Sequence, residues 1–148
     1  MKKWMISIIV VAVMAGAWLV TSRFSPYGPS DDAGVIHVRV IQADGEVVID
    51  DTWSFTREDR VLFDVLDRHY RLVLREDFVW MRDRAVLGID DVKTDFVTNF
   101  LRITLHYPET VDHDARVETA ITGVDRLPLL DGMTYVFHVT PVYGGNQP

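Results

Sequence analysis

Two acidic clusters in the chain hold residue types that bind metal ions. Asp112–Asp114 combines two carboxylates with an imidazole, and His106 lies a few residues before it. Such ligands suit a hard or borderline cation, but neighbouring residues of a strand point in opposite directions, so we interpret the cluster as a solvent-exposed acidic loop. Asp90, Asp91 and Asp95 offer oxygen ligands without the spacing or the glycine of a calcium-binding loop. We therefore predict no metal site and expect Asp90 to shape a turn.

The chain is poor in nucleophiles. It has no cysteine, which excludes thiol catalysis, disulfides, thiolate zinc sites and a lipid anchor on cysteine. Ser54 is the only serine after residue 30, and no G-x-S-x-G, H-E-x-x-H, P-loop or dinucleotide-binding motif is present. We therefore expect neither catalysis nor a cofactor. A small hydrolase working through Asp and His stays as an alternative, with Asp51 as its candidate residue.

Aromatic and imidazole side chains supply the candidates for ligand binding. Trp80 and Tyr107 are the two residues that we predict to stack on a ligand, although aromatic residues in strands more often belong to the core. His37, His106 and His138 occur in strand-like segments and can share one face of a sheet. Such a face is either ordinary solvent-exposed surface or a pH-sensitive or ligand-facing surface.

The N-terminal segment determines the expected location. Trp4–Thr21 has no charged residue, and as a helix it spans roughly 27 Å, about the thickness of the hydrocarbon core of a membrane. Lys2 and Lys3 precede it, so the positive-inside rule puts the rest of the chain outside the cytoplasm. We predict a signal anchor over residues 1–22, or a signal peptide cleaved at Ala15–Ala17. The domain is then either a single-pass membrane protein or secreted.

The rest of the chain is expected to form three parts. Residues 23–34 are rich in Ser, Pro and Gly and are expected to form a loose tether, residues 35–143 one domain, and residues 144–148 a loose tail. The chain carries a formal charge of −7 over 148 residues. Because three of its 15 cations flank the apolar segment, the remainder holds 12 cations against 22 acids. A body that acidic repels phosphate backbones, which argues against nucleic-acid binding.

Periodicity indicates an α+β domain. Val35–Ile41 alternates, and the Asp44-Gly45 turn pairs Val40 with Ile49 and Ile36 with Trp53. That register puts Asp51 opposite Val38 on the apolar face, which predicts either a bulge at Asp50-Asp51 or a buried functional carboxylate. An amphipathic helix of about four turns is expected after an N-cap at Thr56. The later strands are expected at 77–81, 84–89, 100–107, 116–121 and 133–139, so that one helix covers a mixed sheet.

Several short turn-like pieces occur in an order that resembles a known family. They are Val61–Asp67, Val86–Asp90, Thr94-Asp95 with Asn99–Leu101, Gly123–Asp125, Leu130–Gly132 and Tyr135–Phe137. Together they resemble the transcobalamin-like C-terminal domain family, a widespread extracytoplasmic domain in bacteria, mostly of unassigned function. The resemblance implies a β-grasp-like fold related to soluble-ligand-binding modules. In the animal cobalamin carriers the corresponding domain helps to enclose the corrinoid.

One segment departs from the family. Where the family often has an aromatic-rich strand ending in a Val-Asn-Gly turn, this chain has Leu105–Glu109, which leads into a longer acidic loop. The expected function is a non-catalytic, membrane-tethered, extracytoplasmic binding module for a vitamin-sized, cobalamin-like solute. The alternative is a cell-surface protein–protein interaction module without a small-molecule ligand, whose partner is a membrane protein.

Overall fold

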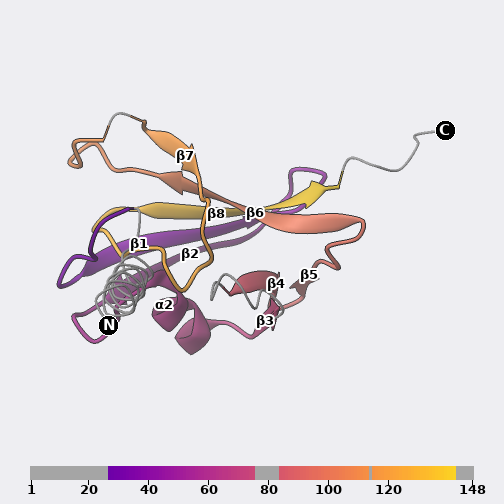
Figure 1. Cartoon of the computed structure of the whole chain (residues 1–148), viewed down its shortest axis with the longest axis horizontal. Coiled ribbons are helices and arrows are strands. Elements are labelled where there is room, and N and C mark those ends of the chain that lie inside the picture. Colours follow the sequence, from indigo (N-terminus) through magenta and orange to yellow (C-terminus); the bar gives the residue numbers. More distant parts are fainter. Residues whose placement is uncertain (1–26, 76–83, 114, 143–148) are drawn as a thin grey trace, which may run out of the picture.

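The computed structural model describes residues 27–75, 84–113 and 115–142 (Figure 1). Its elements are β1 (Gly34–Ile41), β2 (Val47–Phe55), α2 (Leu62–His69), β3 (Leu72–Arg75), β4 (Ala85–Ile89), β5 (Val92–Lys93), β6 (Asn99–His106), β7 (Val117–Thr119) and β8 (Thr134–Pro141). The described part is mostly strands with one short helix. The predicted α+β class is therefore confirmed.

The strands form two sheets. The larger has the order β2-β1-β8-β6-β7, and the smaller has the order β3-β4-β5. At the centre of the larger sheet β1 and β8 run parallel, whereas the other pairs in both sheets are antiparallel. Figure 1 shows α2 and the smaller sheet on the same side of the larger sheet. The apolar core fills the space between these layers.

The β1–β2 hairpin confirms the predicted register but moves the bulge. Ile36 pairs with Trp53 and Val40 with Ile49, as expected from the alternation. The bulge lies beside the turn, between Val40 and Ile41, and not at Asp50-Asp51. Gly45 has a φ of +90°, so the connection is a longer turn with a left-handed glycine, and the extra residue is absorbed there. The prediction of a bulge at Asp50-Asp51 is therefore wrong.

The helix is shorter than predicted and begins later. Thr56 does not cap it: the Thr56 amide donates to the Asp59 carboxylate at 3.0 Å, which closes a separate turn. Helix α2 begins at Leu62, where the Asp64 carboxylate accepts the amides of Arg60 and Val61 at 2.7 and 3.2 Å. A capping-type motif therefore occurs at both places, but only the second starts a helix. The apolar stripe of the prediction does face the core, through Leu62, Val65 and Leu66.

The later strands mostly follow the prediction. Those expected at 84–89, 100–107 and 133–139 correspond to β4, β6 and β8, and the one expected at 116–121 is the shorter β7. Leu105, Tyr135 and Phe137 are fully buried, because alternate residues of β6 and β8 face the core. The strand expected at 77–81 lies outside the described residues. Strands β3 and β5 were not predicted, since both are too short to show a clear period.

The segment that precedes β1 is attached to the domain from Tyr27 onward. The Asp31 amide donates to the Leu129 carbonyl at 2.7 Å, and the Asp31 carboxylate accepts the Asp131 amide at 2.8 Å. The described part of the expected tether is thus hydrogen-bonded to the loop before β8. The predicted anchor and the C-terminal tail lie outside the described residues. Within the described ranges no helix is long and apolar enough to cross a membrane.

Candidate functional site

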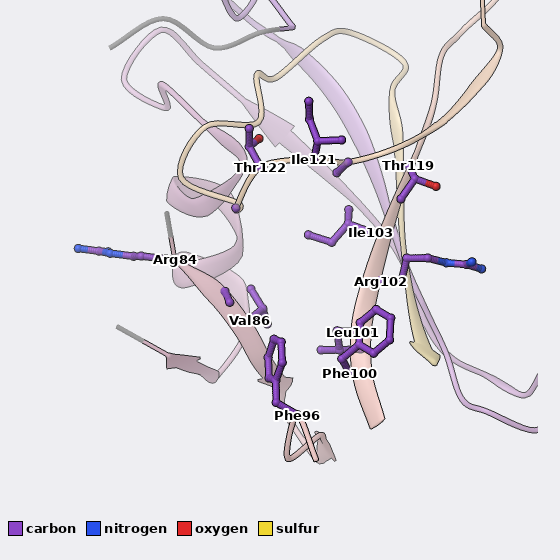
Figure 2. Close-up of a pocket in the computed structure, with 13 residues that line it drawn as sticks. Arg84, Val86, Phe96, Phe100, Leu101, Arg102, Ile103, Thr119, Ile121 and Thr122 are labelled. Atoms are coloured by element: carbon purple, nitrogen blue, oxygen red, sulfur yellow. The ribbon is translucent and has the colours of Figure 1, made fainter. Parts of the chain in front are cut away.

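A cavity of about 520 Å³ lies between β6 and the start of β4 (Figure 2). Its walls are mainly apolar side chains and backbone. The lining residues are Arg84, Ala85, Val86, Phe96, Phe100, Leu101, Arg102, Ile103, Thr119, Ala120, Ile121, Thr122 and Gly123. In Figure 2 the labelled side chains of Leu101 and Ile103, from β6, lie across the cavity from Val86 of β4. The volume falls within the range of small-molecule binding sites.

One wall depends on a close backbone approach at Gly123. A Cβ atom at this position would lie 2.6 Å from the Arg84 carbonyl oxygen and 2.9 Å from the Arg84 nitrogen. The Asp125 carboxylate accepts the Arg84 amide at 2.9 Å, which holds the two segments together. Glycine is therefore required where the loop after β7 meets the start of β4.

A second wall is the tight loop between β5 and β6. One Asp95 carboxylate oxygen accepts the amides of Val97 and Thr98 at 2.8 and 2.7 Å. These hydrogen bonds favour the charged carboxylate and lower the pKa of Asp95 to about 2. The loop carries Phe96 with a φ of +62°, a conformation that aromatic residues rarely adopt. The rings of Phe96 and Phe100 lie 6.5 Å apart at the cavity. Strained residues of this kind cluster at ligand sites.

The polar groups of the cavity are few. Thr122 Oγ1 is buried and has no hydrogen-bond partner among the described residues. Figure 2 shows the side chains of Arg84 and Arg102 extending away from the cavity in opposite directions. The guanidinium of Arg84 stacks instead on Phe63, with its carbon 4.7 Å from the ring centroid. The described interior therefore suits an uncharged apolar group.

The structure places one of the two predicted ligand-stacking residues, and that residue does not line this cavity. Trp80 lies outside the described residues. Tyr107 is buried, with its ring centroid 3.9 Å from that of His113, and its hydroxyl donates to Glu118 at 3.2 Å. Burial and the nearby Glu118 carboxylate raise the pKa of Tyr107. The aromatic residues that do line the cavity are Phe96 and Phe100, which the sequence reasoning missed.

The candidate hydrolase residues also lie apart from the cavity. Asp51 faces the inner side of the sheet, where its carboxylate accepts the Tyr70 hydroxyl at 2.9 Å. That hydroxyl accepts the Trp53 indole N–H at 2.6 Å, so Asp51 ends a short hydrogen-bonded chain. Ser54 is exposed and pairs with Val35 across the hairpin. Neither Asp51 nor Ser54 lines the cavity.

The candidate metal ligands are separated in a similar way. Among the described residues no group of three His, Asp or Glu side chains is placed to hold a metal ion. Asp114 lies outside the described residues, and His113 Nδ1 lies 2.8 Å from the Ala115 carbonyl oxygen. Asp90 has a φ of +52°, and its carboxylate accepts the Arg71 amide at 2.8 Å. The prediction that Asp90 shapes a turn is confirmed.

The three strand histidines share the outward face of the larger sheet, as predicted. His37 and His106 both pair with Thr134, one from each side, and His138 lies four residues farther along β8 and pairs with Arg102. Burial lowers the pKa of His138, and the charges of Arg102 and His106 lower it further. This face is opposite the side that carries α2 and the apolar core.

A pH-dependent stability is expected from His69. Its ring stacks on Trp53 with centroids 3.7 Å apart, and burial, followed by the charge of Arg68, lowers the pKa of His69. The imidazole therefore takes up a proton more readily in the unfolded chain than in the folded one. The contribution of His69 to the free energy of unfolding is complete above about pH 6.5 and is lost as the pH falls below that value. Between about pH 7.5 and pH 5.5, the free energy of unfolding measured with urea should fall less for His69→Gln than for the wild type. Equal losses would contradict this assignment.

Comparison with known proteins adds no family to this description: no family model matches the chain, and no curated protein matches it. The resemblance to the transcobalamin-like domains stays a prediction from short sequence pieces. The site is therefore interpreted from its own geometry.

Proposed function

We propose that the chain is a non-catalytic, membrane-tethered, extracytoplasmic binding module whose cavity holds an apolar part of a small solute. The observation that carries this proposal is the cavity of about 520 Å³, walled by apolar side chains, with a strained phenylalanine at its edge. Among the described residues that line the cavity there is no carboxylate and no imidazole, which favours binding over catalysis.

The arrangement of the strands supports a β-grasp-like fold for this module. A β-hairpin is followed by a helix, and the first and last strands pair in parallel at the centre of a β2-β1-β8-β6-β7 sheet. This is the order that a β-grasp-like domain has. The fold alone does not define a ligand, so the ligand is argued from the cavity.

The size and polarity of the cavity restrict the solute. A corrinoid has far more atoms than a space of about 520 Å³ encloses, so only a part of such a molecule would enter. A small vitamin or an apolar side group fits better. The location outside the cytoplasm is supported by the apolar run Trp4–Thr21 and the lysines before it.

The direct test uses a fragment of residues 27–148, which keeps the contacts of Tyr27–Asp31 with the domain. The uncharged fluorophore N-phenyl-1-naphthylamine is titrated first, followed by calorimetry with cyanocobalamin and a panel of small vitamins. Saturable binding at micromolar concentration or tighter would support the proposal. A folded fragment that binds neither the fluorophore nor any member of the panel would contradict it.

The substitution Phe96→Asn separates binding from folding. Asparagine tolerates the positive φ of this position, so the free energy of unfolding is expected to stay within about 1 kcal/mol of the wild-type value. Loss of the ring should weaken binding of the naphthylamine by about tenfold or more. The matched control is Val97→Asn, the next residue, which is 77% exposed. Equal affinity of wild type and Phe96→Asn would remove this loop from the site.

A protein–protein interaction module is the second candidate, and the outward face of the larger sheet favours it. His37, Arg39, Arg102, His106 and His138 occupy outward positions, and Asp50 is the one carboxylate among the outward positions of the described strands β1, β2, β6 and β8. Arg39 is paired with Asp50 at 2.9 Å, so Arg102 carries the remaining full charge of these positions, and the imidazoles offer hydrogen bonds to a polar protein partner. A folded protein without any probe binding would favour this candidate.

A further inference from the structure

The chain leading from the predicted membrane segment is fastened at the edge of the cavity. The Tyr27 hydroxyl accepts the Ile121 amide at 2.8 Å, and Ile121 lines the cavity. Ser30 Oγ accepts the Leu129 amide at 2.9 Å and donates to the Arg60 carbonyl at 2.6 Å. This end of the domain is therefore held in place by several hydrogen bonds that involve residues far apart in the sequence.

The distance from the cavity to the predicted membrane segment is short. Tyr27 is the sixth residue after Thr21, the last residue of the apolar run. An extended chain advances at most about 3.6 Å per residue, so Tyr27 lies within roughly 22 Å of the end of that run. A loose tether of residues 23–34 would leave the orientation of the domain open, but the attachment at Tyr27 keeps Ile121 close to the membrane surface.

The cavity edge is apolar on its outside as well. Ile121 is 77% exposed, and Val97, which follows the cavity residue Phe96, is also 77% exposed. Large aliphatic side chains exposed at the mouth of an apolar cavity are unfavourable in water but favourable against lipid.

From these contacts we infer that the cavity opens toward the membrane and that its occupant is an acyl chain of a membrane lipid. This inference rests on the proposed binding function and names the ligand class. An acyl chain matches the uncharged apolar walls of the cavity. A membrane supplies such chains at high local concentration within reach of the domain.

The test uses the full chain in vesicles of phosphatidylcholine and phosphatidylglycerol that contain a phosphatidylcholine with a diazirine on its acyl chain. After irradiation, crosslinked residues are mapped by mass spectrometry. Crosslinks are expected on cavity residues such as Phe100 and Ile103, as well as within residues 4–21. Ile121→Asp should lower the crosslinks in the cavity by about tenfold. Because Ile121 is exposed, this change should not affect folding.

Other results would overturn the inference. Crosslinks confined to residues 4–21 of a folded protein, or a membrane-purified chain that begins after Ala17, would each exclude the lipid occupant. Ala120→Trp serves as a second variant that fills the cavity without changing its edge. If the naphthylamine binds but the lipid does not crosslink in the cavity, the binding function stands and the lipid assignment fails. If neither is seen, both fail.

Discussion

The substitution Ala120→Trp is expected to weaken naphthylamine binding by about a hundredfold or more. Ala120 lines the cavity just after β7, so an indole at this position would occupy the space that the probe needs. Because the cavity is already open, the new side chain should cause little strain. The free energy of unfolding is therefore expected to stay within about 1 kcal/mol of the wild-type value or to rise. Fluorescence titration and urea unfolding of the same preparation measure both quantities.

The matched control for this change is Val117→Trp. Val117 is the first residue of β7, three residues before Ala120. It is 52% exposed and does not line the cavity. Its substitution should leave the affinity for the probe unchanged. Equal weakening by both variants would mean that the probe binds elsewhere, and unchanged affinity in Ala120→Trp would exclude this cavity as the site.

The substitution Tyr135→Ala is expected to lower the free energy of unfolding by about 3–5 kcal/mol. Tyr135 is fully buried in β8, between β1 and β6, and its hydroxyl donates to the Pro128 carbonyl. The truncation therefore removes a large part of the core and a hydrogen bond to the loop that precedes the strand. For a domain of ordinary stability such a loss approaches the whole free energy of unfolding.

Tyr135→Phe separates the two contributions. It keeps the ring but leaves the Pro128 carbonyl without this donor, so a loss of about 1–2 kcal/mol is expected. Urea unfolding at one pH compares the three proteins. A Tyr135→Ala variant as stable as Tyr135→Phe would show that the ring does not carry the core packing described above.

The parts of the fold that the sequence predicted are those with a local signal. The alternation of β1, β6 and β8 is long enough to assign inner and outer faces, and it also placed His37, His106 and His138 on one face. The start of the helix was not predictable in this way. Thr56 and Val61 each have an aspartate three residues later, but Thr56 is a residue type that usually caps a helix and Val61 is not, so the sequence favoured the wrong start.

The candidate site was harder to predict because the cavity joins segments that are distant in the sequence. Phe96 and Phe100 lie before and inside β6, whereas Thr122 and Gly123 follow β7. No single motif contains them. The sequence of the Asp95–Asn99 loop does indicate a turn, because Asp95 followed by Thr98 suits a turn that the aspartate side chain closes. Tyr107 is buried, as aromatic residues in strands usually are.

The most direct test of the binding function is the location of the bound probe. In a nuclear magnetic resonance titration of the 27–148 fragment with N-phenyl-1-naphthylamine, the largest amide shifts are expected at Val86, Phe96, Ile103 and Thr122, which surround the cavity. Intermolecular contacts between probe and methyl groups should involve Ile103 and Ile121. Shifts that are absent, or that concentrate on the outward face around His37 and His138, would contradict the assignment of the cavity as the ligand site.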